Sequence, residues 1–207
     1  ACYRYGIALQ LRGDFDRAQD LLEQGLKHLE TDDSLASSAW IRAALPRGLG
    51  GIHWQRGLAL RDRPEARVER LKHLEAACDE TAAALDAAAG VVVGIEHDEY
   101  RKALNNLTYY LYEYLSIDPA GKRGKITKAI LEKRLKELEK ATPKVDLAAL
   151  HSMHTIMVVR QYLKQTEAAK NMANAILTNI YRAARRATRD ENLRMDQMRK
   201  HLHSKIH

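Results

Sequence analysis

Hydrophobic residues recur at every third or fourth position along almost the whole chain, which is the spacing of a helix with one buried face. The one strand-like run, Val91–Val93, has no partner run elsewhere, so we expect the end of a helix or a loop there. Turn signals divide the pattern into about ten predicted helices, over residues 2–11, 15–30, 35–45, 52–60, 65–89, 98–117, 125–140, 146–163, 167–187 and 190–203. The pattern therefore predicts an all-α protein.

Two of the predicted turns depend on glycine and proline. Gly13 lies between two helical stretches, in Arg12–Gly13–Asp14, and is free to adopt a positive φ. Pro46, followed by Gly48 and by the pair Gly50–Gly51, is expected to end one helix and to delay the next. Short turns between helices favour antiparallel helix pairs.

Composition narrows the class of protein. The chain has 207 residues, of which 45% are hydrophobic and 29% are charged, as in ordinary globular domains. Cys2 and Cys78 are too few for a disulfide framework or a zinc site, which favours a reducing compartment and a cytoplasmic location. The longest apolar stretch, residues 82–95, contains Asp86 and is too short to span a bilayer, so we expect no membrane partner.

The first helix pair carries a recognisable motif. Gly6 and Leu9 precede the turn at Gly13, and Phe15 and Ala18 follow it, with Leu22, Gly25 and Leu26 further along the second helix. Small residues at positions 6 and 18 would let the two helices touch, Phe15 would wedge the turn, and Leu22 and Leu26 would close the pair. This arrangement resembles the tetratricopeptide repeat (TPR).

Later segments repeat the motif less completely. Gly57–Leu60 resembles Gly6–Leu9, Leu104–Leu111 resembles a first helix, and Ala168, Met172, Ala175 and Ile176 repeat the spacing of Ala18, Leu22, Gly25 and Leu26. The copies lie about 50 residues apart, against roughly 34 for a regular TPR. We divide the chain into repeat units 1–34, 35–94, 95–142 and 143–187, which form one repeat domain over 1–187, followed by a basic tail over 188–207.

The resemblance implies an α-solenoid of antiparallel helix pairs wound into a right-handed superhelix, with a protein or peptide bound in its concave groove. The chain also resembles the C-terminal TPR regions of large bacterial signalling and regulatory proteins. Since it starts inside a helical pattern and without Met, we expect it to be part of a longer protein. The expected role is that of a scaffold or sensor, while other domains supply any chemistry.

The TPR resemblance also implies candidate groove residues on the first helix of each pair. They are Arg4, Gln55, Asn106 and His154, followed about one helical turn later by Arg61, Tyr112 and Arg160. Lys102 and Asn106, at i and i+4, are similar to part of the carboxylate clamp of some TPR domains. The alternative interpretation, that all of these are ordinary exposed helix positions, stays open.

Charge is distributed unevenly. Residues 1–120 hold 14 Lys and Arg against 19 Asp and Glu, a net charge of −5, whereas residues 121–207 hold 20 against 8, a net charge of +12. Arg182, Arg185, Arg186 and Arg189 fall on one predicted helical face and could contact an acidic partner or the phosphates of a nucleic acid. One aromatic residue nearby, Tyr181, gives no platform for base stacking, and a solvated helix face remains an alternative.

The sequence gives little support for catalysis or for a cofactor. It contains no glycine-rich phosphate loop, no zinc-protease motif and no nucleophile elbow, so we predict a non-enzyme without catalytic residues, cofactor or metal site. His151 and His154 share a helical face but lack further ligands at suitable spacing. Tyr109, Tyr110, Tyr112 and Tyr114 crowd one helix, and we expect two of them in the core and the others exposed.

Overall fold

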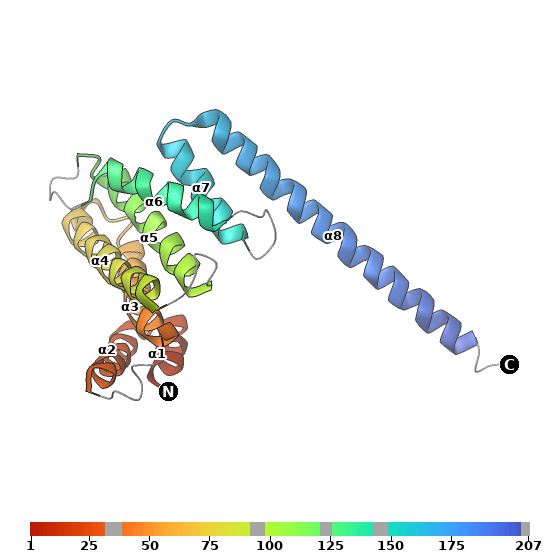
Figure 1. The fold of residues 1–207 in the computed structure, drawn as a ribbon, viewed down its shortest axis with the longest axis horizontal. Helices are drawn as coiled ribbons and strands as arrows, with labels where there is room; N and C mark the ends of the chain where they lie inside the picture. Colours follow the sequence, from red (N-terminus) through yellow and green to blue (C-terminus); the bar gives the residue numbers. More distant parts are fainter. Residues whose placement is uncertain (32–38, 92–97, 121–125, 143–148, 204–207) are drawn as a thin grey trace. The chain divides into compact units, whose positions relative to one another are not determined.

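A computed structural model describes residues 1–31, 39–91, 98–120, 126–142 and 149–203, with side chains as far as residue 189 except those of residues 39, 90 and 91 (Figure 1). The described residues form eight α-helices and one 3-10 turn, and they contain no β-strand. The helices are α1 (Cys2–Leu11), α2 (Phe15–Thr31), α3 (Ala39–Ala59), α4 (Arg67–Val91), α5 (Asp98–Ile117), α6 (Lys128–Ala141), α7 (Leu150–Tyr162) and α8 (Thr166–His203). The predicted all-α class is confirmed, while the predicted count of about ten helices is wrong.

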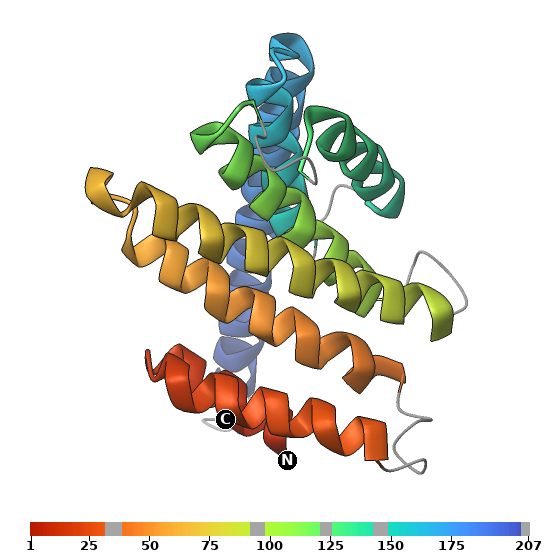
Figure 2. The ribbon, with the colours of Figure 1, turned by 90° about the vertical axis from the view of Figure 1, so that its left-hand side faces the viewer.

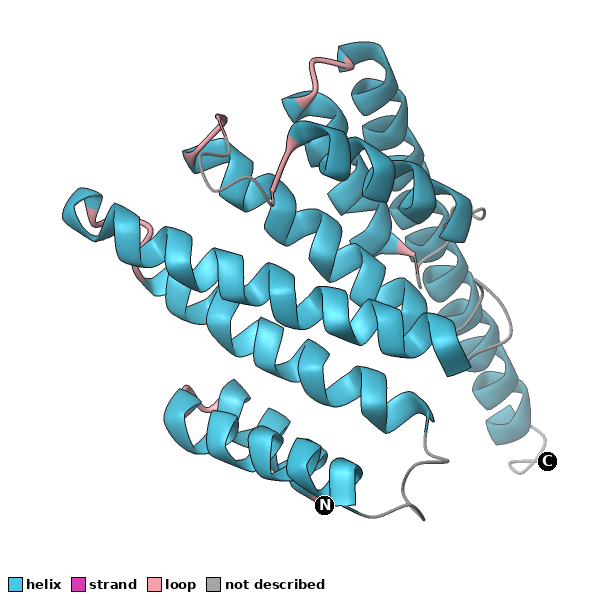
Figure 3. Ribbon diagram, turned by 60° about the vertical axis from the view of Figure 1, so that its left-hand side comes forward, coloured by secondary structure: helices cyan, strands magenta, loops and turns pink. Residues whose placement is uncertain are grey.

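The chain divides into two compact units, Ala1–Pro143 with α1 to α6 and Lys144–His207 with α7 and α8. In the first unit, α1 packs on α2, α3 on α4 and α5 on α6, and successive pairs meet through α2 with α3 and α4 with α5. Figure 2 shows α1 and α2 as one layer, α3 and α4 as the next, and α5 alongside α3 and α4, and Figure 3 shows the same helices from another side.

The first helices of successive pairs also contact each other directly, α1 with α3 and α3 with α5. Within the described residues, no backbone contact of this kind joins α2 to α4 or α4 to α6. The first helices are therefore closer to one another than the second helices are, and we call the side formed by α1, α3 and α5 the α1/α3/α5 side.

The turn and the packing predicted for the first pair are confirmed. Gly13 has φ +80°, a conformation that a residue with a Cβ rarely adopts. Leu22 is fully buried, and a Cβ added at Gly6 would lie 2.8 Å from its Cδ2 atom. A Cβ added at Gly48 of α3 would lie 2.9 Å from Leu22 Cδ1, so Leu22 fills the space between two glycines of different helices.

The predicted break at residues 46–51 is wrong, because α3 runs without interruption from Ala39 to Ala59 and contains Pro46. Proline removes one backbone hydrogen bond and strains a helix interior. Here Leu45 and Leu49, before and after Pro46 in the sequence, are both buried in the core that α3 shares with α1 and α2. The tertiary burial of α3 outweighs the local signal of a break.

Of the glycines that we took as part of that break, Gly50 serves the packing of α3 on α4. A Cβ added at Gly50 would collide with the Thr81 hydroxyl and lie 3.0 Å from the Ala77 carbonyl oxygen of α4. Near the C-terminal end of α3, a Cβ at Gly57 would find its nearest neighbour, His73 Cβ, at 3.5 Å. The two helices therefore approach more closely at Gly50 than at Gly57.

Helices α5 and α6 complete the first unit. Tyr110 and Tyr114 of α5 are buried and Tyr109 and Tyr112 are half-buried, so two of the four tyrosines lie in the core as predicted, while the other two are less exposed than expected. Thr127 caps the start of α6, where its hydroxyl accepts a 3.3 Å hydrogen bond from the Ile130 amide. The helix predicted from residue 125 thus begins at Lys128.

In the second unit, α7 and the first part of α8 form a pair joined at Lys164, which has φ 60°. The predicted gap between helices 167–187 and 190–203 is wrong, because α8 is continuous from Thr166 to His203. Residues 166–203 contain no glycine or proline, and the Thr188 hydroxyl donates a 3.0 Å hydrogen bond back to the Ala184 carbonyl. The polar residues between 187 and 190 therefore do not end the helix, because no glycine or proline accompanies them.

The predicted turn residues 32–34, most of the link at 90–94 and the predicted helix start at 146 lie outside the described residues.

Candidate functional site

One arginine joins the three helices of the α1/α3/α5 side. Arg47 of α3 donates a 2.8 Å hydrogen bond to the Tyr3 hydroxyl of α1 and forms an ion pair with Glu99 of α5, with 3.0 Å between Nη2 and Oε2. Its Nε also donates to Glu99, at 3.1 Å. Both charged side chains are about five-sixths buried, so this pair is shielded from solvent much more than a surface ion pair.

Aromatic side chains lie on both sides of Arg47 along the α1/α3/α5 side. Trp54 of α3 stacks on Tyr110 of α5, with ring centroids 5.8 Å apart and an interplanar angle of 18°. It also meets Tyr109 edge-on at 6.1 Å. At the other end, Trp40 meets Tyr3 edge-on at 5.8 Å. These arrangements are the ones that aromatic pairs favour.

Some side chains on the α1/α3/α5 side remain accessible to a partner. Trp40, Arg47, Trp54 and Leu58 share one face of α3 because they are spaced by seven, seven and four residues. Trp40 and Leu58 are 44% and 36% exposed. We define the α1/α3/α5 face as Tyr3, Trp40, Arg47, Trp54, Leu58, Tyr109 and Tyr112, a surface rich in aromatic rings with one fixed ion pair.

A second charged cluster lies where α3, α4 and α5 meet. Glu113, a nearly buried residue of α5, receives hydrogen bonds from Arg61 at 3.1 Å, from Arg70 at 3.0 Å and from the Tyr109 hydroxyl at 3.2 Å. Burial, and secondly the charge of Glu113, raises the pKa of Tyr109 above its usual value. The predicted groove residue Arg61 is thus partly engaged in an ion pair, although its side chain remains 47% exposed.

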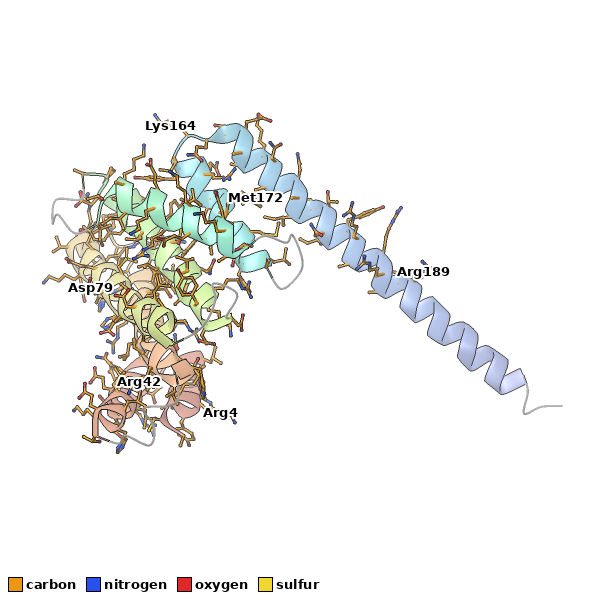
Figure 4. All side chains as sticks on the ribbon, in the orientation of Figure 1. Arg4, Arg42, Asp79, Lys164, Met172 and Arg189 are labelled. Carbon is orange, nitrogen blue, oxygen red and sulfur yellow. The ribbon has the colours of Figure 1, made fainter. Side chains whose placement is uncertain are left out.

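The other predicted groove residues of the first unit lie on the expected helices. Arg4 of α1 is exposed (Figure 4), while Gln55 of α3 and Asn106 and Tyr112 of α5 are half-buried. The Gln55 Oε1 atom is enclosed and has no hydrogen-bond partner within the described part of the chain. The Tyr112 ring contacts the Tyr109 ring, with 5.8 Å between the two ring centroids.

Lys102, the predicted clamp residue, is paired within its own helix. Its ammonium lies 2.6 Å from an Asp98 carboxylate oxygen and 3.0 Å from one of Glu99. The hydrogen bond to Asp98, and after it the one to Glu99, raises the pKa of Lys102 despite partial burial. A carboxylate ligand at Lys102 would have to compete with both acidic side chains.

The remaining predicted residues belong to the second unit, which is described by itself. His154 of α7 is exposed and Arg160 is half-buried. On α8, Arg182, Arg185, Arg186 and Arg189 are all exposed, and the Arg185 guanidinium lies 4.8 Å from the centre of the Tyr181 ring. This distance is that of a cation–π contact.

Sequence reasoning missed four residues that make the contacts between first helices, namely Tyr3, Trp40, Arg47 and Trp54. Arg47 was assigned to a break between helices, so its place on a helix face was not considered. Once α3 is recognised as continuous, the spacing of Trp40, Arg47 and Trp54 places them on one face, and that spacing is visible in the sequence.

A third group of titratable residues lies between α2, α3 and α4. The rings of His53 and His73 are 5.8 Å apart, and Arg56 of α3 donates 2.6 Å hydrogen bonds to Gln19 and Asp16 of α2. Burial, followed by the charges of His73 and Arg56, lowers the pKa of His53 below 6.5. The pKa of His73 is also lowered, mainly by burial. Burial and the neighbouring positive charge thus favour the neutral form of both imidazoles.

Among the described side chains, no group of three or more His, Cys, Asp or Glu is arranged to hold a metal ion. None of the described helices combines the length and the apolar character needed to cross a membrane. Comparisons with protein-family models, with curated proteins and with solved structures find no match to this chain.

Proposed function

We propose that the chain is a TPR-like module that binds a protein or an extended peptide on its α1/α3/α5 face. The observation that carries this proposal is the set of contacts among first helices, α1 with α3 and α3 with α5, which the second helices do not make in the described residues. In a solenoid of helix pairs, the helices that approach each other most closely line the inner, concave side. The same pattern, with the motif at Gly6–Leu26, supports a solenoid interpretation of the first unit.

The chemistry of this face suits peptide recognition. Tyrosine, tryptophan and arginine are the residues most enriched at the energetically important positions of protein interfaces. Here Trp40, Trp54 and Tyr109 are oriented by ring contacts, and Arg47 is fixed by Tyr3 and Glu99. Side chains that are already ordered lose less conformational entropy on binding. We expect the aromatic rings to supply most of the affinity, and Arg4 and Asn106 to contribute polar contacts at the edges.

A display library of unstructured twelve-residue peptides, selected against the full chain, tests the proposal. For the selected peptides, Leu58→Asp should raise the Kd by about tenfold or more, because it places a charge in a desolvated interface. Val68→Asp is the matched control, since Val68 is 62% exposed on α4, outside the face, and receives the same substitution. Equal effects of the two variants, or no selected peptide, would exclude the α1/α3/α5 face as the binding site.

The alternative function is nucleic-acid binding by the basic second half of the chain. It is supported by the net charge of +12 over residues 121–207 and by the exposure of the four arginines on α8. Such binding should weaken steeply with salt, by roughly one power of the salt concentration for each phosphate contacted. Absence of binding to duplex DNA and to single-stranded RNA at low salt would exclude this alternative.

A further inference from the structure

Helix α8 is much longer than the helix that it packs on. It has 38 residues and α7 has 13, which correspond to lengths of about 57 Å and about 20 Å at 1.5 Å per residue. Figure 4 shows Met172 on the part of α8 nearer to α7, and Arg189 far along the part that extends beyond α7. Most of α8 therefore has no neighbouring helix among the described residues of its own unit.

The apolar face of α8 continues past the end of α7. Ala169 is buried and Met172 and Ile176 are half-buried, but Leu177, Ile180 and Tyr181 are 64%, 46% and 60% exposed. Ala173, Leu177, Ile180 and Ala184 follow each other at intervals of four, three and four residues, so they form one line along the helix. We name Ala173, Leu177, Ile180, Tyr181 and Ala184 the α8 stripe. The stripe extends the seam that α7 already occupies.

The composition of the α8 stripe favours a helix as its occupant. The three-and-four spacing is the one by which two helices interlock their side chains. Ala173 and Ala184 lie before and after Leu177 and Ile180 along this line. Their small side chains leave room for a second helix to approach α8 closely. An amphipathic helix that binds a lipid surface depends instead on bulky apolar residues throughout its buried face.

Charge around the stripe selects the partner. The charged residues between Glu167 and Asp190 are all basic, namely Lys170, Arg182, Arg185, Arg186 and Arg189. Arg185 borders the stripe beside Tyr181, over whose ring it lies, and Arg189 follows Arg185 one turn later along the same edge. An antiparallel second copy of α8 would place two such basic edges against each other, whereas a helix with an acidic edge would pair with them.

We propose that the α8 stripe docks an amphipathic helix of a partner protein that carries acidic residues along one side of its own apolar seam. Leu177, Ile180 and Tyr181 provide the apolar contact, and Arg185 and Arg189 pair with the acidic flank. This site lies in the second unit and depends neither on the α1/α3/α5 face nor on the function proposed for it.

A display library of helical peptides tests the proposal on the full chain. Its members keep leucine at the seam positions and vary the flanking positions. We expect the selected peptides to be enriched in Asp and Glu at one flank. A Leu177→Ser/Tyr181→Ser variant should bind them about tenfold or more weakly, while Asn171→Ser/Asn179→Ser, off the stripe, should leave binding nearly unchanged. Leu177, Tyr181 and Asn171 are exposed and Asn179 is half-buried, so circular dichroism should show an intact fold for both variants.

A second pair of variants separates the edge charges from overall charge. Arg185→Glu/Arg189→Glu and Arg182→Glu/Arg186→Glu change the net charge equally, but Arg182 and Arg186 lie further round the helix from the stripe. We expect the first variant to lose about tenfold in affinity for acidic peptides and to gain affinity for peptides with a basic flank, with a much smaller effect of the second.

Several outcomes would overturn the proposal. They are a library without enriched members, enriched peptides without an acidic flank, or equal effects of the two charge-reversing variants. Dimerisation that is seen by light scattering and is lost in Leu177→Ser/Tyr181→Ser would assign the stripe to a second copy of this chain instead. Binding to vesicles of phosphatidylserine and phosphatidylcholine that is lost in Leu177→Ser/Tyr181→Ser, without peptide binding, would assign it to a lipid surface.

Discussion

Replacing Gly50 of α3 by alanine is expected to destabilise the first unit, although alanine is the better helix former. Gly→Ala inside a helix normally stabilises by about 1 kcal/mol. At Gly50 the new Cβ would collide with the Thr81 hydroxyl and lie 3.0 Å from the Ala77 carbonyl oxygen, and the latter belongs to the rigid backbone of α4. Overpacking of a close-packed interior costs about 1–3 kcal/mol, and the two simultaneous clashes place this variant at the upper end, so we expect a net loss of about 2 kcal/mol.

Gly57→Ala is the matched control, because it lies on the same helix and also faces α4. Its Cβ would find its nearest neighbour at 3.5 Å, an ordinary contact distance. With no clash to offset the gain in helix propensity, we expect this variant to be stabilised by about 0.5 kcal/mol, somewhat less than in a helix centre because α3 ends at Ala59.

Urea unfolding followed by tryptophan fluorescence measures both variants. Trp40 and Trp54, the two tryptophans of the chain, both lie on α3, so their emission reports on the first unit. Opposite signs for Gly50→Ala and Gly57→Ala would support the close approach of α3 and α4 at Gly50. Stabilisation by both substitutions would show that the two helices are further apart there than the structure has them.

Three further predictions concern other features of the first unit. Pro46→Ala should raise the free energy of unfolding by about 1 kcal/mol or more, because α3 regains a hydrogen bond and loses a steric conflict; a loss in urea unfolding would argue against a continuous α3. Glu113→Gln should cost about 3 kcal/mol, since it leaves the nearly buried Arg70 without a counter-charge; Asp118→Asn, a more exposed carboxylate, is the control, and equal midpoints would contradict the cluster. The lowered pKa values of His53 and His73 mean that the unfolded chain binds more protons near pH 6, so stability should fall as the pH decreases below about 6.5. His53→Gln should flatten that decline between about pH 7 and 5.5, and an unchanged slope of the unfolding midpoint against pH would exclude the histidine pair as its cause.

The sequence predicts the helices of this protein well wherever periodicity and turn chemistry agree. The segment 98–117 and the turn at Gly13 are found as predicted, because a clear apolar face and a residue suited to positive φ each point to one local structure. At Pro46 and Gly50 the same reasoning fails. Proline and glycine signal a break locally, yet in this fold the glycines allow α3 to pack closely on α2 and α4, and that packing keeps the helix continuous.

The candidate face was less predictable than the helices. A repeat motif indicates which helix of each pair faces a groove, and Arg4, Gln55 and Asn106 do lie on α1, α3 and α5. The contacts that define the face depend on residues far apart in sequence, such as Tyr3, Arg47 and Glu99, which lie 44 and 52 residues from each other along the chain. Periodicity within one helix contains no information about such pairs.

Site-specific photo-cross-linking tests the central proposal, peptide binding on the α1/α3/α5 face, most directly. Benzoylphenylalanine is introduced at Trp40, at Leu58 or, as a control on α4, at Val68, and each protein is irradiated with peptides from the twelve-residue library. The proposal predicts that positions 40 and 58 form peptide adducts in mass spectrometry and that position 68 does not. Adducts from position 68, with none from positions 40 and 58, would contradict it.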